Sequence, residues 1–211
     1  TKANRNCIQP QPLLPKEPSK SGRVRLAHIG GMAAHKGYFL FKEAVEKADL
    51  SNTEVIVVDH AQSPGTAKHE MWAQTPVTFL AKFKQEEINQ LYSIMDVLVA
   101  PSMWPESFGL VTREAVAAGV WVITSDKGAI GEDIVSGKTG RICSVNSVEP
   151  LIEALREVDT NFSFIGVNDE SINAEGIKSV RTTDAQVREL DATYQGVLRA
   201  EDASKRHAGP T

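Results

Sequence analysis

The chain is organised around the stretch from Val97 to Ile123, which reads VLVAPSMWPESFGLVTREAVAAGVWVI. It opens with the apolar run VLVA, which has the length and composition of a buried strand. A loop with two prolines follows, and a helix begins near Gly109 and ends at Gly119. A second apolar run, VWVI, comes at once. The stretch therefore predicts a strand, a loop, a helix and a second strand in direct succession.

Two glutamates bracket the start of this helix, Glu106 in the loop and Glu114 within the helix, with seven residues between them. A helix that starts at the carboxyl end of a strand presents free backbone N–H groups and a positive dipole end, which favour a phosphate group. The two carboxylates can accept hydrogen bonds from hydroxyls on either side of that phosphate, as a nucleotide sugar would supply. The alternative is that Glu106 is a solvated loop residue and Glu114 only complements the helix dipole.

Composition indicates an ordinary globular protein. The 211 residues are 41% hydrophobic and 24% charged, with a net charge of −4, which leaves room for one domain with a sizeable core. This charge does not indicate a nucleic-acid or membrane-surface partner. The longest apolar runs are too short to span a bilayer, and the polar, proline-rich start does not resemble a secretion signal.

The cysteines and histidines show no spacing typical of a metal site. Cys7 and Cys143 form no C-x-x-C pair, so we expect free thiols in a reducing compartment and a cytoplasmic location. A Cys7–Cys143 disulfide is the alternative. The five histidines lack ligand spacing, and the sequence has no D-x-D motif. We therefore expect no bound metal and no cofactor.

Strand-like and helix-like segments alternate along the chain. Strands are predicted at residues 24–29, 54–58, 76–81, 96–100, 121–124 and 140–143. Helices are predicted at residues 38–48, 85–94, 109–119, 128–135, 147–158 and 184–203. Residues 59–75 are predicted to be a loop with a short helical turn, and the pattern is weak from 160 to 181. Near-continuous apolar strands that alternate with helices indicate an α/β fold, a Rossmann-like parallel sheet with helices on both faces.

A second loop carries glycines and a lysine. Residues 30–37, directly after the first predicted strand, read GGMAAHKG. Glycines allow close approach to a phosphate, and Lys36 can face its charge. Ligands of such sheets bind outside the carboxyl ends of the strands, where the strand order reverses, so Lys36 and Glu106 are predicted to share one edge. The alternative is a plain strand-to-helix turn with an exposed lysine.

The segment around Glu106 and Glu114 resembles the E-x7-E segment of the retaining glycosyltransferases called group 1 (family 4). The likeness includes Pro-Ser before the first glutamate, Phe-Gly-Leu after it and Ala-Gly at the end. Residues 79–83 (FLAKF), 96–102 (DVLVAPS) and 128–140 (GAIGEDIVSGKTG) are similar to further motifs of the family. The resemblance implies the C-terminal, donor-binding half of a GT-B fold.

Three regions are predicted from composition and resemblance together. Residues 1–22 are polar, with four closely spaced prolines, and are expected to be a linker or extended arm. Residues 23–203 are expected to form a Rossmann-like nucleotide-sugar-binding domain, and residues 204–211 a frayed tail. The acceptor-binding half of the family's fold is expected to be absent, so the chain alone is expected to be inactive.

The resemblance also implies roles for individual residues. Lys36 and Glu106 are expected to be catalytic, Lys36 facing the leaving diphosphate and Glu106 binding sugar hydroxyls. Glu114 is expected to bind the ribose hydroxyls, and Lys82 and Phe83 to lie near the base. The expected donor-binding set is Gly30, Gly31, Lys36, Lys82, Phe83, Glu106, Phe108, Gly109, Leu110 and Glu114. No metal is implied, because Lys36 and backbone N–H groups at the helix start can stabilise the diphosphate charge.

The loop at residues 30–37 departs from the family pattern at one position. The family loop usually reads G-R-x-x-x-x-K-G, whereas this chain has Gly31 in place of the arginine. Two explanations remain open. Either Arg113 or Lys127 supplies the missing cation, or Gly31 makes room for a different donor geometry.

Several functions remain open at this point. The resemblance favours transfer of a sugar from a nucleotide diphosphate sugar to an acceptor hydroxyl, in polysaccharide or glycan biosynthesis. The acceptor, a glycan or lipid-linked glycan, would bind through the absent half. The alternatives are another GT-B enzyme, such as a phosphorylase or epimerase, and a non-catalytic nucleotide-sugar-binding module, which Gly31 keeps open. A purely structural domain would not require both motifs on one sheet edge.

Overall fold

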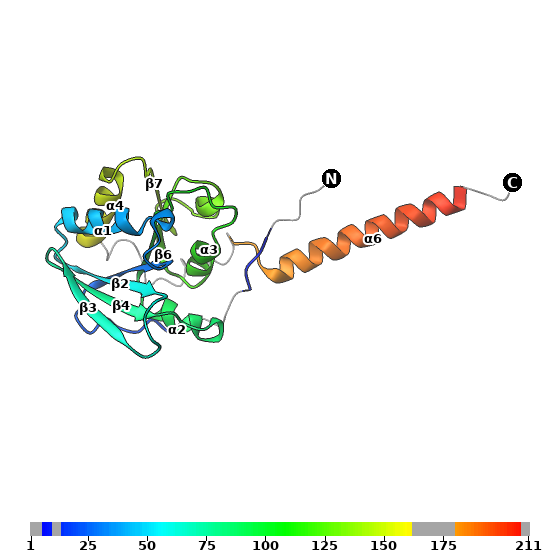
Figure 1. Cartoon of the computed structure of the whole chain (residues 1–211). Coiled ribbons are helices and arrows are strands. Elements are labelled where there is room, and N and C mark those ends of the chain that lie inside the picture. Colours follow the sequence, from blue (N-terminus) through cyan, green and yellow to red (C-terminus); the bar gives the residue numbers. More distant parts are fainter. Residues whose placement is uncertain (1–5, 10–13, 162–179, 208–211) are drawn as a thin grey trace. The chain divides into compact units, whose positions relative to one another are not determined.

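The computed structural model of the chain describes residues 6–9, 14–161 and 180–207. These residues fall into two units, of which the larger lies within Gln11–Val180 and the smaller within Thr1–Pro10 and Arg181–Thr211. The larger unit is built around a seven-stranded sheet in the order β3-β4-β2-β1-β5-β6-β7 (Figure 1).

The sheet is parallel except at one edge. Its strands are β1 (Val24–Ile29), β2 (Thr53–Asp59), β3 (Ala67–Trp72), β4 (Thr75–Ala81), β5 (Val97–Ala100), β6 (Trp121–Ser125) and β7 (Gly140–Cys143). β1 pairs in parallel with both β2 and β5, so the strand order reverses at β1. The carboxyl ends of β1 and β5 are therefore the place where a ligand is expected in such a sheet.

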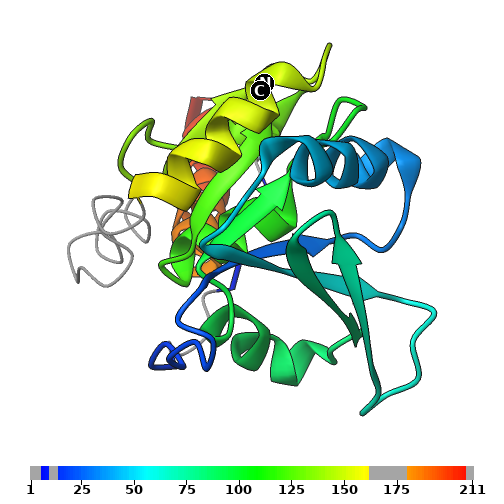
Figure 2. The same cartoon turned by 90° about the vertical axis from the view of Figure 1, so that its left-hand side faces the viewer.

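Helices cover both faces of the sheet, as predicted. They are α1 (Tyr38–Ala48), α2 (Ile88–Ser93), α3 (Leu110–Ala117) and α4 (Glu149–Asn161), with 3₁₀ turns η1 (Ala34–Lys36), η2 (Gln85–Glu87) and η3 (Ala129–Gly131). α1 and α4 lie together on one face, and α2 lies on the opposite face (Figure 2). The predicted α/β, Rossmann-like fold is confirmed.

Burial on both sides explains why the strands are continuous apolar runs. Val97 and Val99 of β5 join the buried cluster under α1 and α4. Leu98, between them, is equally buried but outside that cluster. Because successive side chains of a strand point to opposite faces, a strand covered on both sides must be apolar at every position.

The largest error in the predicted elements lies in residues 59–75. This segment was expected to be a loop, but it contains β3, which pairs antiparallel with β4 through a tight turn at Ala73-Gln74. Ala73 has a φ of 50°, as such a two-residue turn requires. β3 escaped detection because it is an edge strand whose side chains are mostly exposed, with only Trp72 buried. Such a strand has no apolar alternation to reveal it.

Two predicted helices are shorter than expected. The helix expected at 85–94 divides into η2 and α2. The helix expected at 128–135 reduces to η3. In contrast, α4 begins at Glu149, two residues after the expected start, and continues to Asn161. Most of the weakly patterned segment 160–181 lies outside the described residues.

Residues 14–22 of the predicted arm are held to the sheet domain by hydrogen bonds. Lys16 Nζ donates hydrogen bonds to the carbonyl oxygens of Tyr92 (2.9 Å) and Met95 (2.5 Å), at the end of α2. Ser21 donates to a carboxylate oxygen of Glu54 at 2.9 Å. Residues 14–22 are thus an anchored segment, whereas the sequence suggested a linker or extended arm.

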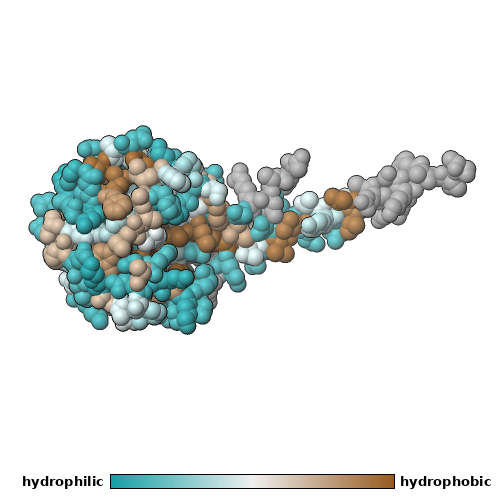
Figure 3. Space-filling view, viewed as in Figure 1, coloured by the Kyte–Doolittle hydropathy of each residue, from teal (hydrophilic) through white to brown (hydrophobic). Residues whose placement is uncertain are grey.

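The smaller unit joins the start of the described chain to its end. Ile8 is buried and exchanges backbone hydrogen bonds with residues 181 and 183. The helix α6 (Thr183–His207) runs four residues beyond the expected end of the domain at 203. Its exposed large apolar side chains are Val187, Tyr194, Val197 and Leu198. Apolar residues are visible along this helix in Figure 3.

Both cysteines, Cys7 and Cys143, are free thiols, as predicted. Within the part of the chain that the structure describes, no helix is long and apolar enough to cross a bilayer. In the same residues, no three His, Cys, Asp or Glu side chains are grouped so that they could hold a metal ion.

Candidate functional site

The site begins where the loop after β1 meets the loop after β5. Gly37 has a φ of 80° and lies so close to Pro101 that a Cβ on Gly37 would overlap the Pro101 carbonyl. The main chain of Met103 donates to the carbonyl of His35 at 2.9 Å. These contacts bring Lys36, at the end of η1, beside the loop that carries Glu106.

Lys36 and Glu106 form an ion pair at the carboxyl edge of the sheet. Lys36 Nζ lies 2.6 Å from Glu106 Oε1, and the buried Ser102 hydroxyl lies 2.9 Å from the same oxygen. Burial opposes ionisation of Glu106, but the hydrogen bonds from Lys36 and Ser102 outweigh it and hold the pKa of the carboxyl below its usual value. The structure thus brings together the two residues predicted to be catalytic.

A second close approach fixes the main chain of Glu106. Gly128 forms a bridge with Glu106, and a Cβ on Gly128 would lie 2.4 Å from the Glu106 carbonyl oxygen and 2.6 Å from its nitrogen. The φ of Gly128 is 70°, which favours glycine. The loop after β6 therefore packs against the main chain of Glu106.

A cavity of about 270 Å³ opens beside this pair. Its lining includes Lys36, Ser102 and Glu106 and then the first residues of α3, Leu110 and Val111. The residues predicted from the helix start, Phe108, Gly109 and Leu110, all line it. A helix start beside an ammonium group is an environment that suits an anionic group.

Glu114 lies farther along α3 and does not line this cavity. Its Oε2 accepts a hydrogen bond from the hydroxyl of Tyr92 at 2.9 Å, and Gln85 is a second hydrogen-bond partner. Burial raises the pKa of Glu114, and these hydrogen bonds oppose the rise. Glu106 and Glu114 therefore occupy separate positions along the site.

The residues predicted to lie near the base follow β4. Lys82 is exposed and Phe83 is half-buried, and neither lines the cavity. Gln85, which bonds Glu114, comes three residues after Lys82, so this loop lies on the Glu114 side of the site. Gly30 and Gly31 also lie outside the cavity lining, in the loop that leads to Lys36.

Arg113 is engaged elsewhere and does not replace the family arginine. It is buried, its Nε lies 2.5 Å from Asp133 Oδ2, and its guanidinium lies 4.1 Å from the centre of the Phe108 ring. Lys127 donates to the side chain of Asn146 at 3.1 Å. A Cβ on Gly31 would lie 3.8 Å from the His60 ring, an ordinary van der Waals contact, and the φ of Gly31 is 63°.

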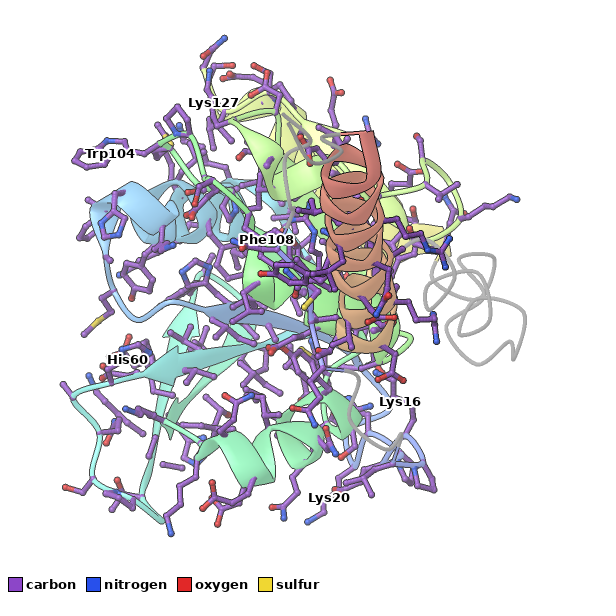
Figure 4. All side chains as sticks on the ribbon, turned by 90° about the vertical axis from the view of Figure 1, so that its right-hand side faces the viewer. Lys16, Lys20, His60, Trp104, Phe108 and Lys127 are labelled. Carbon is purple, nitrogen blue, oxygen red and sulfur yellow. The ribbon has the colours of Figure 1, made fainter. Side chains whose placement is uncertain are left out.

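Three residues that build this site, Ser102, Tyr92 and Thr112, were not predicted from the sequence. Ser102 holds Glu106, Tyr92 holds Glu114, and Thr112 Oγ lies 2.9 Å from the carbonyls of Gly109 and Ile130. Glu114 lies 22 residues from Tyr92 and Ile130 lies 18 residues from Thr112, whereas Ser102 and Glu106 are only four residues apart. Trp104, by contrast, extends into solvent with 68% of its surface exposed (Figure 4).

Solved structures share this fold with low sequence identity. The sucrose-phosphate synthase of Thermosynechococcus elongatus superposes with a TM-score of 0.71 at 18% identity, covering 92% of this chain and 52% of that chain. Anabaena HepE, solved in complex with UDP and glucose, gives a TM-score of 0.66 at 16% identity over 83% of this chain and 49% of its own. The C-terminal domain of LpcC, a glycosyl transferase group 1 family protein of Francisella tularensis, gives a TM-score of 0.55 at 20% identity. The superposition covers 75% of this chain and 84% of that domain.

Curated relatives are similar over shorter stretches. The D-inositol 3-phosphate glycosyltransferase of Rhodococcus erythropolis is 37% identical over 126 residues, 56% of this chain and 28% of the relative. The glycogen synthase of Mycobacterium tuberculosis is 37% identical over 91 residues, 43% of this chain and 21% of the relative. Spore coat protein SA of Bacillus subtilis is 44% identical over 66 residues, which are 31% of this chain and 18% of the relative. The chain spans less than a third of each of these relatives.

The sheet domain has the Rossmann-like fold of the C-terminal domains of GT-B proteins. More specifically, the chain belongs to the glycosyl transferases group 1 family, which matches residues 11–161. The predicted family and fold are thereby confirmed. Retention at the anomeric carbon, membership of family 4 and the roles of single residues stay predictions.

The fit between Gly37 and Pro101 can be tested with a matched pair of variants. Gly65 has a φ of 77°, close to the 80° of Gly37, but a Cβ there would meet nothing within 4 Å. Gly65→Ala should therefore cost only the backbone strain, about 1 kcal/mol of unfolding free energy. Gly37→Ala adds the overlap with Pro101 and should cost about 3 kcal/mol. Urea unfolding of both variants measures the difference, and equal losses would contradict the close approach.

Proposed function

We propose that this domain binds the nucleotide diphosphate sugar donor of a retaining glycosyltransferase. The observation that carries the proposal is the meeting of Lys36 and Glu106 beside a cavity at the start of α3, where the strand order reverses. An ammonium group and helix N–H groups suit a diphosphate, and a carboxylate suits sugar hydroxyls. The HepE structures, which share the fold, were solved with UDP, with UDP and glucose, and with UDP-glucose.

The ion pair suggests how the donor would enter. In the free domain the Lys36 ammonium and the Glu106 carboxylate form an ion pair at 2.6 Å, so each group neutralises the charge of the other. A diphosphate would take Lys36 as its counter-ion, and Glu106 would then accept hydrogen bonds from the sugar. As the sugar–phosphate bond breaks, Lys36 and the N–H groups of α3 would stabilise the growing charge on the diphosphate. No metal ion is needed in this scheme.

The acceptor and the pathway are part of the same proposal. We propose that the acceptor hydroxyl belongs to a glycan or lipid-linked glycan and binds to a part of the protein outside these residues. Among the relatives is the lipopolysaccharide core biosynthesis mannosyltransferase LpsB of Rhizobium meliloti, 30% identical over 54% of this chain and 25% of its own length. This similarity supports a role in polysaccharide synthesis. On this proposal the isolated domain binds a donor without transferring it, and the free thiols suit a reducing, cytoplasmic compartment.

The test is a calorimetric titration of the domain with UDP, GDP, ADP and dTDP, repeated with Glu114→Ala. We expect saturable binding of one nucleotide, weakened about tenfold or more by the substitution, because a hydrogen bond to a charged group contributes about 1.5–3 kcal/mol. Glu153→Ala, which removes an exposed carboxylate on α4, is the matched control and should bind normally. The absence of binding by all four nucleotides would count against a donor site in this domain.

A second function, a binding module without turnover, is favoured by one observation. Gly31 stands where the family usually has an arginine. Arg113 is buried against Asp133, and neither Arg113 nor Lys127 lines the cavity. Donor hydrolysis or transfer by the full-length protein distinguishes the two functions. Nucleotide binding with no turnover of any donor would favour the module.

A further inference from the structure

Tyr92 connects the sheet domain's core to one of the two site glutamates. It lies in the last turn of α2, only 5% exposed, with its ring among core residues. Its hydroxyl reaches α3 and donates to Glu114 Oε2 at 2.9 Å. Burial, reinforced by the charge of Glu114, raises the pKa of Tyr92 well above its usual value, so the phenol keeps its proton. Tyr92 is therefore a permanent donor to Glu114.

Glu114 keeps acceptor capacity for a ligand. A carboxylate offers about four lone-pair positions, and the hydrogen bonds that stabilise Glu114 come from two side chains, Tyr92 and Gln85. A glutamate side chain that is free to rotate would lose rotamer freedom on binding a ligand. A hydrogen-bond donor that is fixed in the core, such as the Tyr92 hydroxyl, removes most of that entropic cost, because it holds the carboxylate in one orientation before the ligand binds.

The position of Glu114 limits which part of a ligand it can meet. It lies beyond the cavity that Lys36 and Glu106 line, on the side of the loop with Lys82 and Phe83. A ligand whose phosphates face Lys36 and whose base faces this loop would place its ribose between them. The ribose carries two neighbouring hydroxyls, which suit a carboxylate fixed in one orientation.

We propose that Tyr92 is a positioning residue that orients Glu114 toward a ribose diol and makes the domain prefer ribonucleoside over 2′-deoxyribonucleoside diphosphates. This inference rests on the proposed donor site and narrows its substrate class. It predicts that UDP, GDP or ADP is the preferred nucleotide and that dTDP is disfavoured, since dTDP lacks the 2′-hydroxyl. Tyr92 contacts Glu114 and needs no contact with the nucleotide.

The experiment compares Tyr92→Phe with the wild-type domain. The phenyl ring keeps its core packing, and only the hydroxyl is lost. Calorimetry measures the affinities of UDP, GDP and ADP and of their 2′-deoxy counterparts. We expect the wild type to prefer the best ribonucleotide about tenfold over its deoxy form, as loss of a hydrogen bond to a charged group implies. Tyr92→Phe should reduce this preference to about twofold, mainly by weakening the ribonucleotide.

Two further variants separate the possible outcomes. Tyr194→Phe removes an exposed tyrosine hydroxyl on α6 and should leave the preference unchanged. Glu114→Gln should abolish the preference, since the amide is a weaker acceptor. If Glu114→Gln weakens binding but Tyr92→Phe keeps the wild-type preference, the role of Tyr92 is refuted while the donor site stands. If none of the ribonucleotides binds the wild type, or Glu114→Gln binds normally, both proposals fall.

Discussion

Replacing Lys36 with alanine is expected to weaken binding of the preferred nucleoside diphosphate by about 10- to 100-fold. A hydrogen bond between an ammonium group and a phosphate contributes about 1.5–3 kcal/mol, and about 1.4 kcal/mol corresponds to tenfold in affinity. In the structure Lys36 reaches Glu106 at 2.6 Å beside the cavity, so its charge is already directed toward the expected phosphate position. No other lysine or arginine among the described residues lines this cavity.

The ligand series shows whether Lys36 acts on the phosphates. The free nucleoside carries no phosphate, so Lys36→Ala should leave its weak binding almost unchanged while weakening the diphosphate strongly. Lys20→Ala, which removes an exposed lysine from the anchored segment, serves as the control for loss of one positive charge. Equal affinity of Lys36→Ala and wild type for the diphosphate would remove Lys36 from the donor site.

Lys36→Ala should change the free energy of unfolding only slightly. The Lys36 and Glu106 side chains are 37% and 22% exposed, and ion pairs that water reaches contribute about 0–1 kcal/mol. A small change in the unfolding midpoint together with a large loss of affinity would separate a functional role from a structural one. Circular dichroism during urea unfolding gives this second measurement.

Replacing Asp96 with alanine is expected to have the largest effect on stability, about 3–5 kcal/mol. Asp96 accepts two hydrogen bonds from the Arg25 guanidinium, at 2.9 and 2.8 Å, and a third from the Arg25 main chain at 2.9 Å. Both residues are less than 9% exposed. The substitution would leave a buried guanidinium without its counter-charge, and a buried, unpaired charge is costly.

Two comparisons make this result specific. Lys47→Ala breaks an exposed pair with Glu43 on α1 and should change the unfolding free energy very little. The double variant Arg25→Met/Asp96→Leu removes both charges and should recover much of the stability lost in Asp96→Ala. Urea unfolding of the three proteins tests this. A loss in Asp96→Ala no greater than in Lys47→Ala would contradict a buried, structural ion pair.

The sequence predicted the sheet because its strands are buried on both sides. The run VLVA at residues 97–100 is apolar at every position, and β5 does lie in the middle of the parallel sheet. β3 was missed for the opposite reason, since an exposed edge strand has no apolar pattern. The helix expected at 128–135 became a 3₁₀ turn, because the loop there packs on Glu106 through Gly128.

The sequence by itself indicated the family through several ordered motifs, and it indicated the parallel α/β sheet through apolar strands that alternate with helices. It also indicated the sheet edge where Lys36 and Glu106 meet, because parallel strands align their carboxyl ends. Only the tertiary structure decided which partners complete the site. Tyr92 and Gly128 contact the glutamates from other segments, and Arg113 contacts Asp133. Contacts between residues distant in the chain have no periodicity in the sequence, so folding alone brings them together.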